Sequence, residues 1–64
     1  MKIRIKTYNG ELPSYLTVGK VYDGAINYSS PYVLILDDYG DELDVRLDSS
    51  NHLNGGSWEV VSEK

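Results

Sequence analysis

One short stretch constrains this chain more than any other: two β-favouring runs separated by a tight turn. Residues 32–36 read Tyr-Val-Leu-Ile-Leu, residues 37–41 read Asp-Asp-Tyr-Gly-Asp, and residues 42–47 read Glu-Leu-Asp-Val-Arg-Leu. Two runs of this kind around a glycine-containing turn are typical of a β-hairpin. We therefore expect the chain to be built around a central hairpin.

The turn of this hairpin can be closed in two ways. Asp37 suits the first position of a type I turn because its carboxylate can accept hydrogen bonds from later backbone amides, and Gly40 suits the fourth, where φ can be positive. This pattern predicts a three-residue loop with a glycine bulge. The alternative is a two-residue turn at Tyr39 and Gly40, which needs a penalised positive φ at a bulky residue. We favour the bulged loop.

The turn type decides which side of the third strand is buried, because a one-residue slip exchanges the two faces. The bulged loop pairs Val33 with Val45 in the core, and pairs Ile35 with Leu43 there too. It leaves three apolar side chains pointing outward: Tyr32, Leu34 and Leu36. The tight loop would exchange the two faces of this strand, so that Leu34 and Leu36 point inward. In either register the strand is apolar on both faces, so its second face needs a cover, such as a packed loop, a second subunit or a partner.

The length of the chain sets the scale of the fold. Its 64 residues allow one domain spanning 1–64, near the lower limit for a chain held together by a hydrophobic core alone. Cysteine is absent, which excludes disulfides, thiolate metal sites and thiol nucleophiles. Small secreted domains usually need disulfides for stability. No apolar run approaches the roughly 20 residues of a membrane span. We therefore expect a cytoplasmic protein.

The net charge of −4 bears on possible partners. An acidic chain is repelled by nucleic-acid backbones and by anionic membranes. This charge argues against nucleic acid and membranes as partners.

The first part of the chain reads as a strand followed by a long loop. Residues 2–8 alternate charged and apolar side chains, which predicts a half-buried strand with Ile3, Ile5 and Thr7 inward. Residues 9–15 contain a proline, which would spoil a central strand. We expect an extended loop there.

The end of the chain reads as a single helical turn and a last strand. The last strand is expected at residues 58–61. The helical turn before it buries Leu53, is capped by Asp48 or Ser49, and ends at the two glycines of residues 55–56.

This order of elements resembles the SH3-like barrel, in which a long first loop and a tight third hairpin recur. Residues 16–22, Leu-Thr-Val-Gly-Lys-Val-Tyr, resemble the segment where that long loop ends and the second strand begins. With the Asp-Asp-Tyr-Gly-Asp-Glu turn at residues 37–42, nearly the whole chain is similar to small SH3-like proteins of phages and prophages, including the YorP type. The pattern of signalling SH3 domains that bind proline-rich peptides is not matched, because Tyr32 has no tryptophan beside it.

The resemblance implies an all-β fold: a five-stranded SH3-like barrel with a one-turn helix before the last strand. It also implies a small phage or prophage protein without enzymatic activity or cofactor. Such a protein would act in the cytoplasm of a bacterial host cell, where its partner would be a host protein.

A cluster of carboxylates surrounds the hairpin: Asp37, Asp38, Asp41, Glu42 and Asp44. The alternating ligand spacing of a calcium loop is missing, so no metal site is expected. The cluster could imitate a phosphate backbone and so occupy a host DNA-binding protein. The simpler interpretation, which we favour, is a solvated turn whose charges deter edge pairing.

Catalysis finds little support in the sequence. His52 is the only histidine and has no matched nucleophile, and the glycine pair near the end is isolated and does not form a phosphate-cradling loop. The cations of the first strand could touch nucleic acid, but we expect them to pair with Glu59 or Glu63 across strands. We expect no enzyme and no cofactor.

The chain holds six tyrosines, many for its length. Tyr22 is expected to fill core volume. Four others fall at strand ends and loops: Tyr8, Tyr15, Tyr28 and Tyr32. Their rings either form a contact surface, for which tyrosine is well suited, or close the ends of the fold. Together with Leu34 and Leu36, they are the predicted partner-binding residues.

The sequence thus predicts a protein that binds another protein, either a host factor or a second copy of itself. An acidic decoy for a DNA-binding protein is the alternative, followed by a small nucleic-acid-binding barrel.

Overall fold

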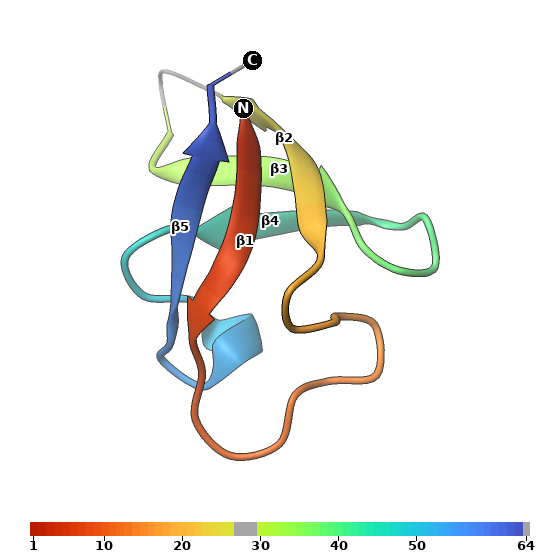
Figure 1. Ribbon diagram of the computed structural model, residues 1–64, viewed down its shortest axis with the longest axis vertical. Coiled ribbons are helices and arrows are strands. Elements are labelled where there is room, and N and C mark those ends of the chain that lie inside the picture. The colour runs from red at the N-terminus through yellow and green to blue at the C-terminus, as the bar shows by residue number, and fades with distance from the viewer. Residues whose placement is uncertain (27–29, 64) are drawn as a thin grey trace.

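A computed structural model describes residues 1–26 and 30–63, and within them the chain is all-β apart from one helical turn (Figure 1). The strands are β1 (Lys2–Thr7), β2 (Val21–Ile26), β3 (Tyr32–Leu36), β4 (Glu42–Arg46) and β5 (Ser57–Ser62). A 3-10 turn, η1 (Asn51–Leu53), precedes β5. The predicted all-β class and the single turn before the last strand are therefore confirmed. In this part of the chain, no helix has the length and apolar character needed to cross a membrane.

The five strands form one antiparallel sheet in the order β4-β3-β2-β1-β5. In Figure 1, β1 and β5 run up and down the view, and β3 and β4 run across it behind them. Strand β2 joins the two parts, because Val21–Asp23 pair with β1 and Gly24–Ile26 pair with β3. The sheet thus folds over on itself, and its inner side encloses the core.

The central hairpin has the predicted bulged loop. Gly40 lies at φ 84°, and its amide donates to the carbonyl oxygen of Asp37 at 3.0 Å. The Asp37 carboxylate accepts hydrogen bonds from the amides of Tyr39 and Asp41 at 2.9 and 3.0 Å. In the resulting register Val33 pairs with Val45, and Ile35 pairs with Leu43, as expected. The tight-loop register is wrong for this chain.

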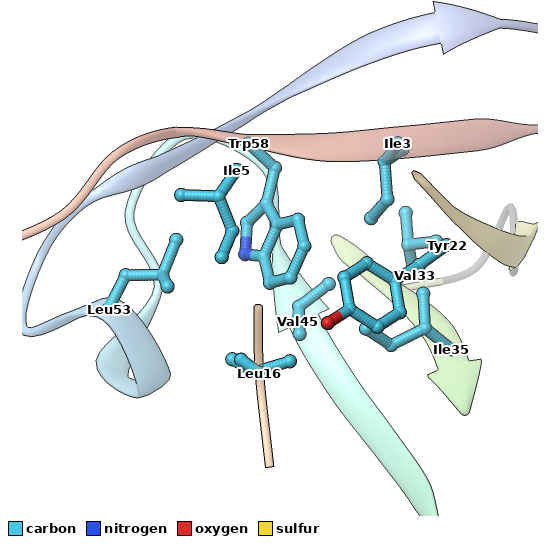
Figure 2. Close-up of a cluster of buried hydrophobic side chains, with 9 residues drawn as sticks. All are labelled: Ile3, Ile5, Leu16, Tyr22, Val33, Ile35, Val45, Leu53 and Trp58. Atoms are coloured by element: carbon cyan, nitrogen blue, oxygen red, sulfur yellow. The ribbon is translucent and has the colours of Figure 1, made fainter. Parts of the chain in front are cut away.

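The core centres on the indole of Trp58, which is 4% exposed (Figure 2). The Tyr22 ring meets it edge to face, with ring centroids 5.8 Å apart. The rest of the core comes from both halves of the folded sheet and from the loops. The buried apolar residues are Ile3, Ile5, Leu16, Tyr22, Val33, Ile35, Val45, Leu53 and Trp58. Tyr22 fills core volume, as predicted.

One local prediction at the end of β1 was wrong. Thr7 is exposed and not inward, because the pairing of β1 with β5 shifts register between Ile5 and Thr7, which breaks the strict alternation. Its hydroxyl instead lies 2.9 Å from that of Ser57.

The helical turn is also capped differently from the prediction. Ser50, and neither Asp48 nor Ser49, holds the N-cap position, and its side chain makes no capping hydrogen bond. Asn54 ends the turn in the left-handed conformation, at φ 55°, ahead of the two glycines. An asparagine tolerates this conformation better than most residues, which is the physical reason that it can replace glycine there.

Candidate functional site

The outer face of β3 carries the apolar side chains that the core does not use. Side chains alternate between the two faces of a strand, so the register that buries Val33 and Ile35 directs Tyr32, Leu34 and Leu36 outward. We call these three residues the β3 stripe. Leu36 is 56% exposed and Tyr32 is 44% exposed, whereas Leu34 is half-buried. The structure therefore brings together three of the six predicted partner-binding residues.

Strand β4 places a charged residue beside each member of the β3 stripe. Its outward positions pair as Leu36 with Glu42, Leu34 with Asp44, and Tyr32 with Arg46. Directly opposite residues on one face have Cβ atoms about 4.5–5.5 Å apart, so these side chains are neighbours. On the other side, Ala25 of β2 lies opposite Leu34. The face is thus an apolar strip with a charged border.

Three solvent-open hollows run along this face. The largest, about 350 Å³, lies between Tyr32 and the segment around η1, and its lining is Tyr32, Asp44, Arg46, Ser49, Ser50, Asn51 and His52. The second, about 240 Å³, shares Tyr32 and Asp44 with the first. The third, about 290 Å³, shares Ala25 and Leu34 with the second. Each hollow thus shares two lining residues with the next.

The charges bordering the stripe are unevenly neutralised. Arg46 forms an ion pair with Asp48 at 3.3 Å. No cation pairs with Glu42 or Asp44 within residues 1–26 and 30–63. Among the residues that the structure describes, the border along β4 therefore offers two unpaired carboxylates.

The structure divides the predicted acidic cluster into two groups. Asp37 is used by the turn, as described above. The Asp38 carboxylate accepts hydrogen bonds from Thr17 Oγ1 at 2.6 Å, Lys20 Nζ at 2.7 Å and Tyr22 Oη at 2.9 Å. The Lys20 hydrogen bond, followed by that of Thr17, lowers the pKa of Asp38 to about 2.

This network ties the end of the long loop to the hairpin. The backbone amide of Asp38 also donates to the carbonyl oxygen of Tyr15 at 2.9 Å. The same ammonium–carboxylate contact raises the pKa of Lys20, and burial raises the pKa of Tyr22. Asp37 and Asp38 therefore make hydrogen bonds within the fold. The other three members of the cluster are exposed: Asp41, Glu42 and Asp44. No group of three or more potential metal ligands occurs in the described part of the chain.

Two other predicted tyrosines, Tyr8 and Tyr15, lie away from the β3 stripe. Tyr15 is half-buried against the core, and its hydroxyl lies 3.1 Å from Nδ1 of His52, with the two rings edge to face. Tyr8 is exposed just beyond the end of β1 and lines none of the three hollows. Tyr28 lies outside the described residues. His52 thus joins the long loop to η1.

The cations of β1 are largely paired, as expected. Arg4 meets Glu59 of β5 at 3.2 Å. Lys2 pairs with Asp23 of β2 at 2.8 Å and not with Glu63, and its hydrogen bond lowers the pKa of Asp23. These pairs leave β1 little free positive charge for a nucleic acid.

Several residues of the face were missed from sequence. Ala25 and the segment 49–52 border the hollows, but no local pattern identifies them. Only the pairing of β2 with β3, and the return of the chain after β4, place them beside the stripe. No protein-family model matches the chain, and it has no significant match among curated proteins or solved structures.

Proposed function

We propose that this chain is a non-enzymatic SH3-like barrel protein that binds another protein through the outer face of β3. The observation that carries the proposal is a strand with apolar side chains on both sides, whose outer members are largely exposed at Leu36 and Tyr32. A chain of 64 residues has few apolar side chains to leave unused. A contiguous exposed apolar strip is typical of an interaction site.

Several features support the SH3-like label. Strand β2 is shared between two parts of the sheet, a long loop separates β1 from β2, and η1 lies between β4 and β5. The Trp58 amide also donates to the Leu47 carbonyl oxygen at 2.8 Å, which brings the start of β5 to the end of β4. The likeness of residues 16–22 and 37–42 to small phage and prophage proteins favours a bacterial host protein as the partner.

A partner of ordinary size would cover a sizeable part of this chain. A standard interface buries about 800 Å² on each partner. The chain exposes 4167 Å², so such a partner would cover about a fifth of its surface.

Capture from a bacterial lysate tests the proposal. The bait proteins are the wild type, Leu36→Asp on the stripe and Val61→Asp as a matched control, because Val61 is a similarly exposed aliphatic residue on β5. We expect wild type and the Val61 variant to retain the same protein and the Leu36 variant to lose it. Equal retention by all three baits, each shown to be folded by its thermal transition, would exclude this face as the binding site.

The acidic decoy is the second candidate, because Asp41, Glu42 and Asp44 stay exposed on one hairpin. Binding carried by these carboxylates alone would survive Leu36→Asp and fade steeply with salt. Binding through the apolar stripe would be lost in the Leu36→Asp variant and would weaken much less with salt. The same baits, washed at low and high ionic strength, distinguish the two candidates.

A further inference from the structure

We infer that the partner presents a basic and apolar segment to this face, with lysine or arginine next to aliphatic or aromatic side chains. The inference rests on the proposed function and adds the chemistry of the partner. It follows from how β3 and β4 arrange apolar and acidic side chains in adjoining columns.

The two columns are in close register. The Asp37 amide donates to the Asp41 carbonyl oxygen at 2.9 Å, which makes these residues a hydrogen-bonded pair at the hairpin end. Hydrogen-bonded and non-hydrogen-bonded pairs alternate along an antiparallel ladder. The pairs Leu36–Glu42 and Leu34–Asp44 are therefore non-hydrogen-bonded, the type in which opposite side chains lie closest. Each leucine of the stripe thus has a carboxylate directly beside it.

These carboxylates are available to a partner. Neither Glu42 nor Asp44 has an ion-pair partner among the residues that the structure describes. Arg46, at the end of the same column, is already paired with Asp48. The third outward-facing pair, Tyr32–Arg46, is therefore close to neutral, and the negative charge is concentrated beside the two leucines.

A partner that covers the leucines also removes water from the carboxylates next to them. A carboxylate that loses water without gaining a cation is strongly disfavoured. The covering segment must therefore bring its own cations to these two positions. An acidic segment, or the identical face of a second copy, would place like charges together. Self-association through this face is thus opposed at low salt and strengthens when salt screens the carboxylates.

The test is selection of binders from a random peptide display library on the intact chain at low ionic strength. We expect the selected peptides to be enriched in lysine and arginine next to apolar residues, relative to the starting library. One selected peptide, made synthetically with a fluorescent label, then serves as the probe in anisotropy titrations. Its affinity is measured against wild type, Leu36→Asp, and a double variant that carries Glu42→Gln and Asp44→Asn.

The double variant keeps the shape of both side chains and removes only their charge. Its matched control carries Glu11→Gln and Glu63→Gln, two exposed positions that line none of the hollows. We expect the charge-neutral double variant to bind about 3- to 10-fold more weakly at low salt, since exposed ion pairs each contribute modestly. The difference should vanish at about 0.5 M salt. The control should bind as wild type does.

The outcomes separate this inference from the function on which it rests. Peptides that need Leu36 but are enriched in acidic, uncharged or proline-rich sequences would overturn the basic partner and leave the binding face intact. Peptides that bind the Leu36→Asp variant as well as wild type, or no selected peptides at all, would overturn both. Sedimentation of the chain alone provides a further check. A dimer that forms at low salt and is lost in the Leu36 variant would show that a second copy covers the face, and would refute the inference.

Discussion

Substitution of Leu53 tests whether the single helical turn is a structural part of the core. Its side chain is 0% exposed, although it comes from a turn of three residues between β4 and β5. Truncating a fully buried leucine to alanine costs about 2–5 kcal/mol, through lost burial and the cavity left behind. Single-core domains of this size rarely reach more than about 3–5 kcal/mol in total. Leu53→Ala is therefore expected to remove most of the free energy of unfolding.

Leu36→Ala is the matched control, because it makes the same chemical change at a side chain that is 56% exposed. Less than half of that side chain is buried and no cavity can form, so the expected cost is below about 1 kcal/mol. Both are measured by urea unfolding, followed through the fluorescence of Trp58, which is the only tryptophan and lies in the core. Leu53→Met, which keeps the volume, should cost less than about 1.5 kcal/mol. Equal losses for Leu53→Ala and Leu36→Ala would refute the packing described here.

Three further predictions follow from contacts away from the β3 stripe. The pKa of Asp38 is about 2 in the folded chain against 3.8 for an unperturbed aspartate, so its contribution to stability is present above about pH 4 and is lost as the pH falls toward 2. Asp38→Asn should therefore lower the melting temperature at neutral pH and flatten its fall between pH 4 and pH 2; an unchanged acid profile would contradict this role. Gly56→Ala should lower the melting temperature sharply, because its new methyl group would overlap the Thr7 carbonyl group at an overpacking cost of about 1–3 kcal/mol. An unchanged melting temperature would show that the two backbone segments can separate at this contact. Tyr15→Phe should cost about 0.5–1.5 kcal/mol in urea unfolding by removing the hydroxyl contact with His52, and should leave partner capture unchanged.

The hairpin was predictable from sequence because its turn is determined locally. Asp37 and Gly40 lie three residues apart, and the hydrogen bonds that they make fix the register of both strands. That register in turn assigns the inner and outer sides of β3, from Val33 in the core to Leu36 at the surface. The alternation of side chains along the strand then assigns each residue to one side, because no distant contact is needed to set the register.

The other parts of the site depend on contacts between distant residues. Asp38 looks like one more acid of a solvated turn until the long loop brings Thr17 and Lys20 to it. The sequence groups Tyr8 and Tyr15 with Tyr32 because all three are tyrosines at strand ends or in loops. The position of a loop tyrosine, however, depends on where its loop is anchored. For Tyr15 that anchor includes His52, a residue with which it shares no local pattern.

Under the proposed function, the two sides of β3 would let one short strand serve both folding and recognition. Val33 and Ile35 are committed to the core, so the outer side chains can be chosen for contact without loosening the fold. An apolar outer side would ordinarily invite copies of the chain to associate. Under the same proposal, Glu42 and Asp44, which have no ion-pair partner among the described residues, would oppose that association by placing negative charge where two copies would meet. The same two carboxylates would favour a partner that supplies cations, so protection from self-association and choice of partner would have one electrostatic cause.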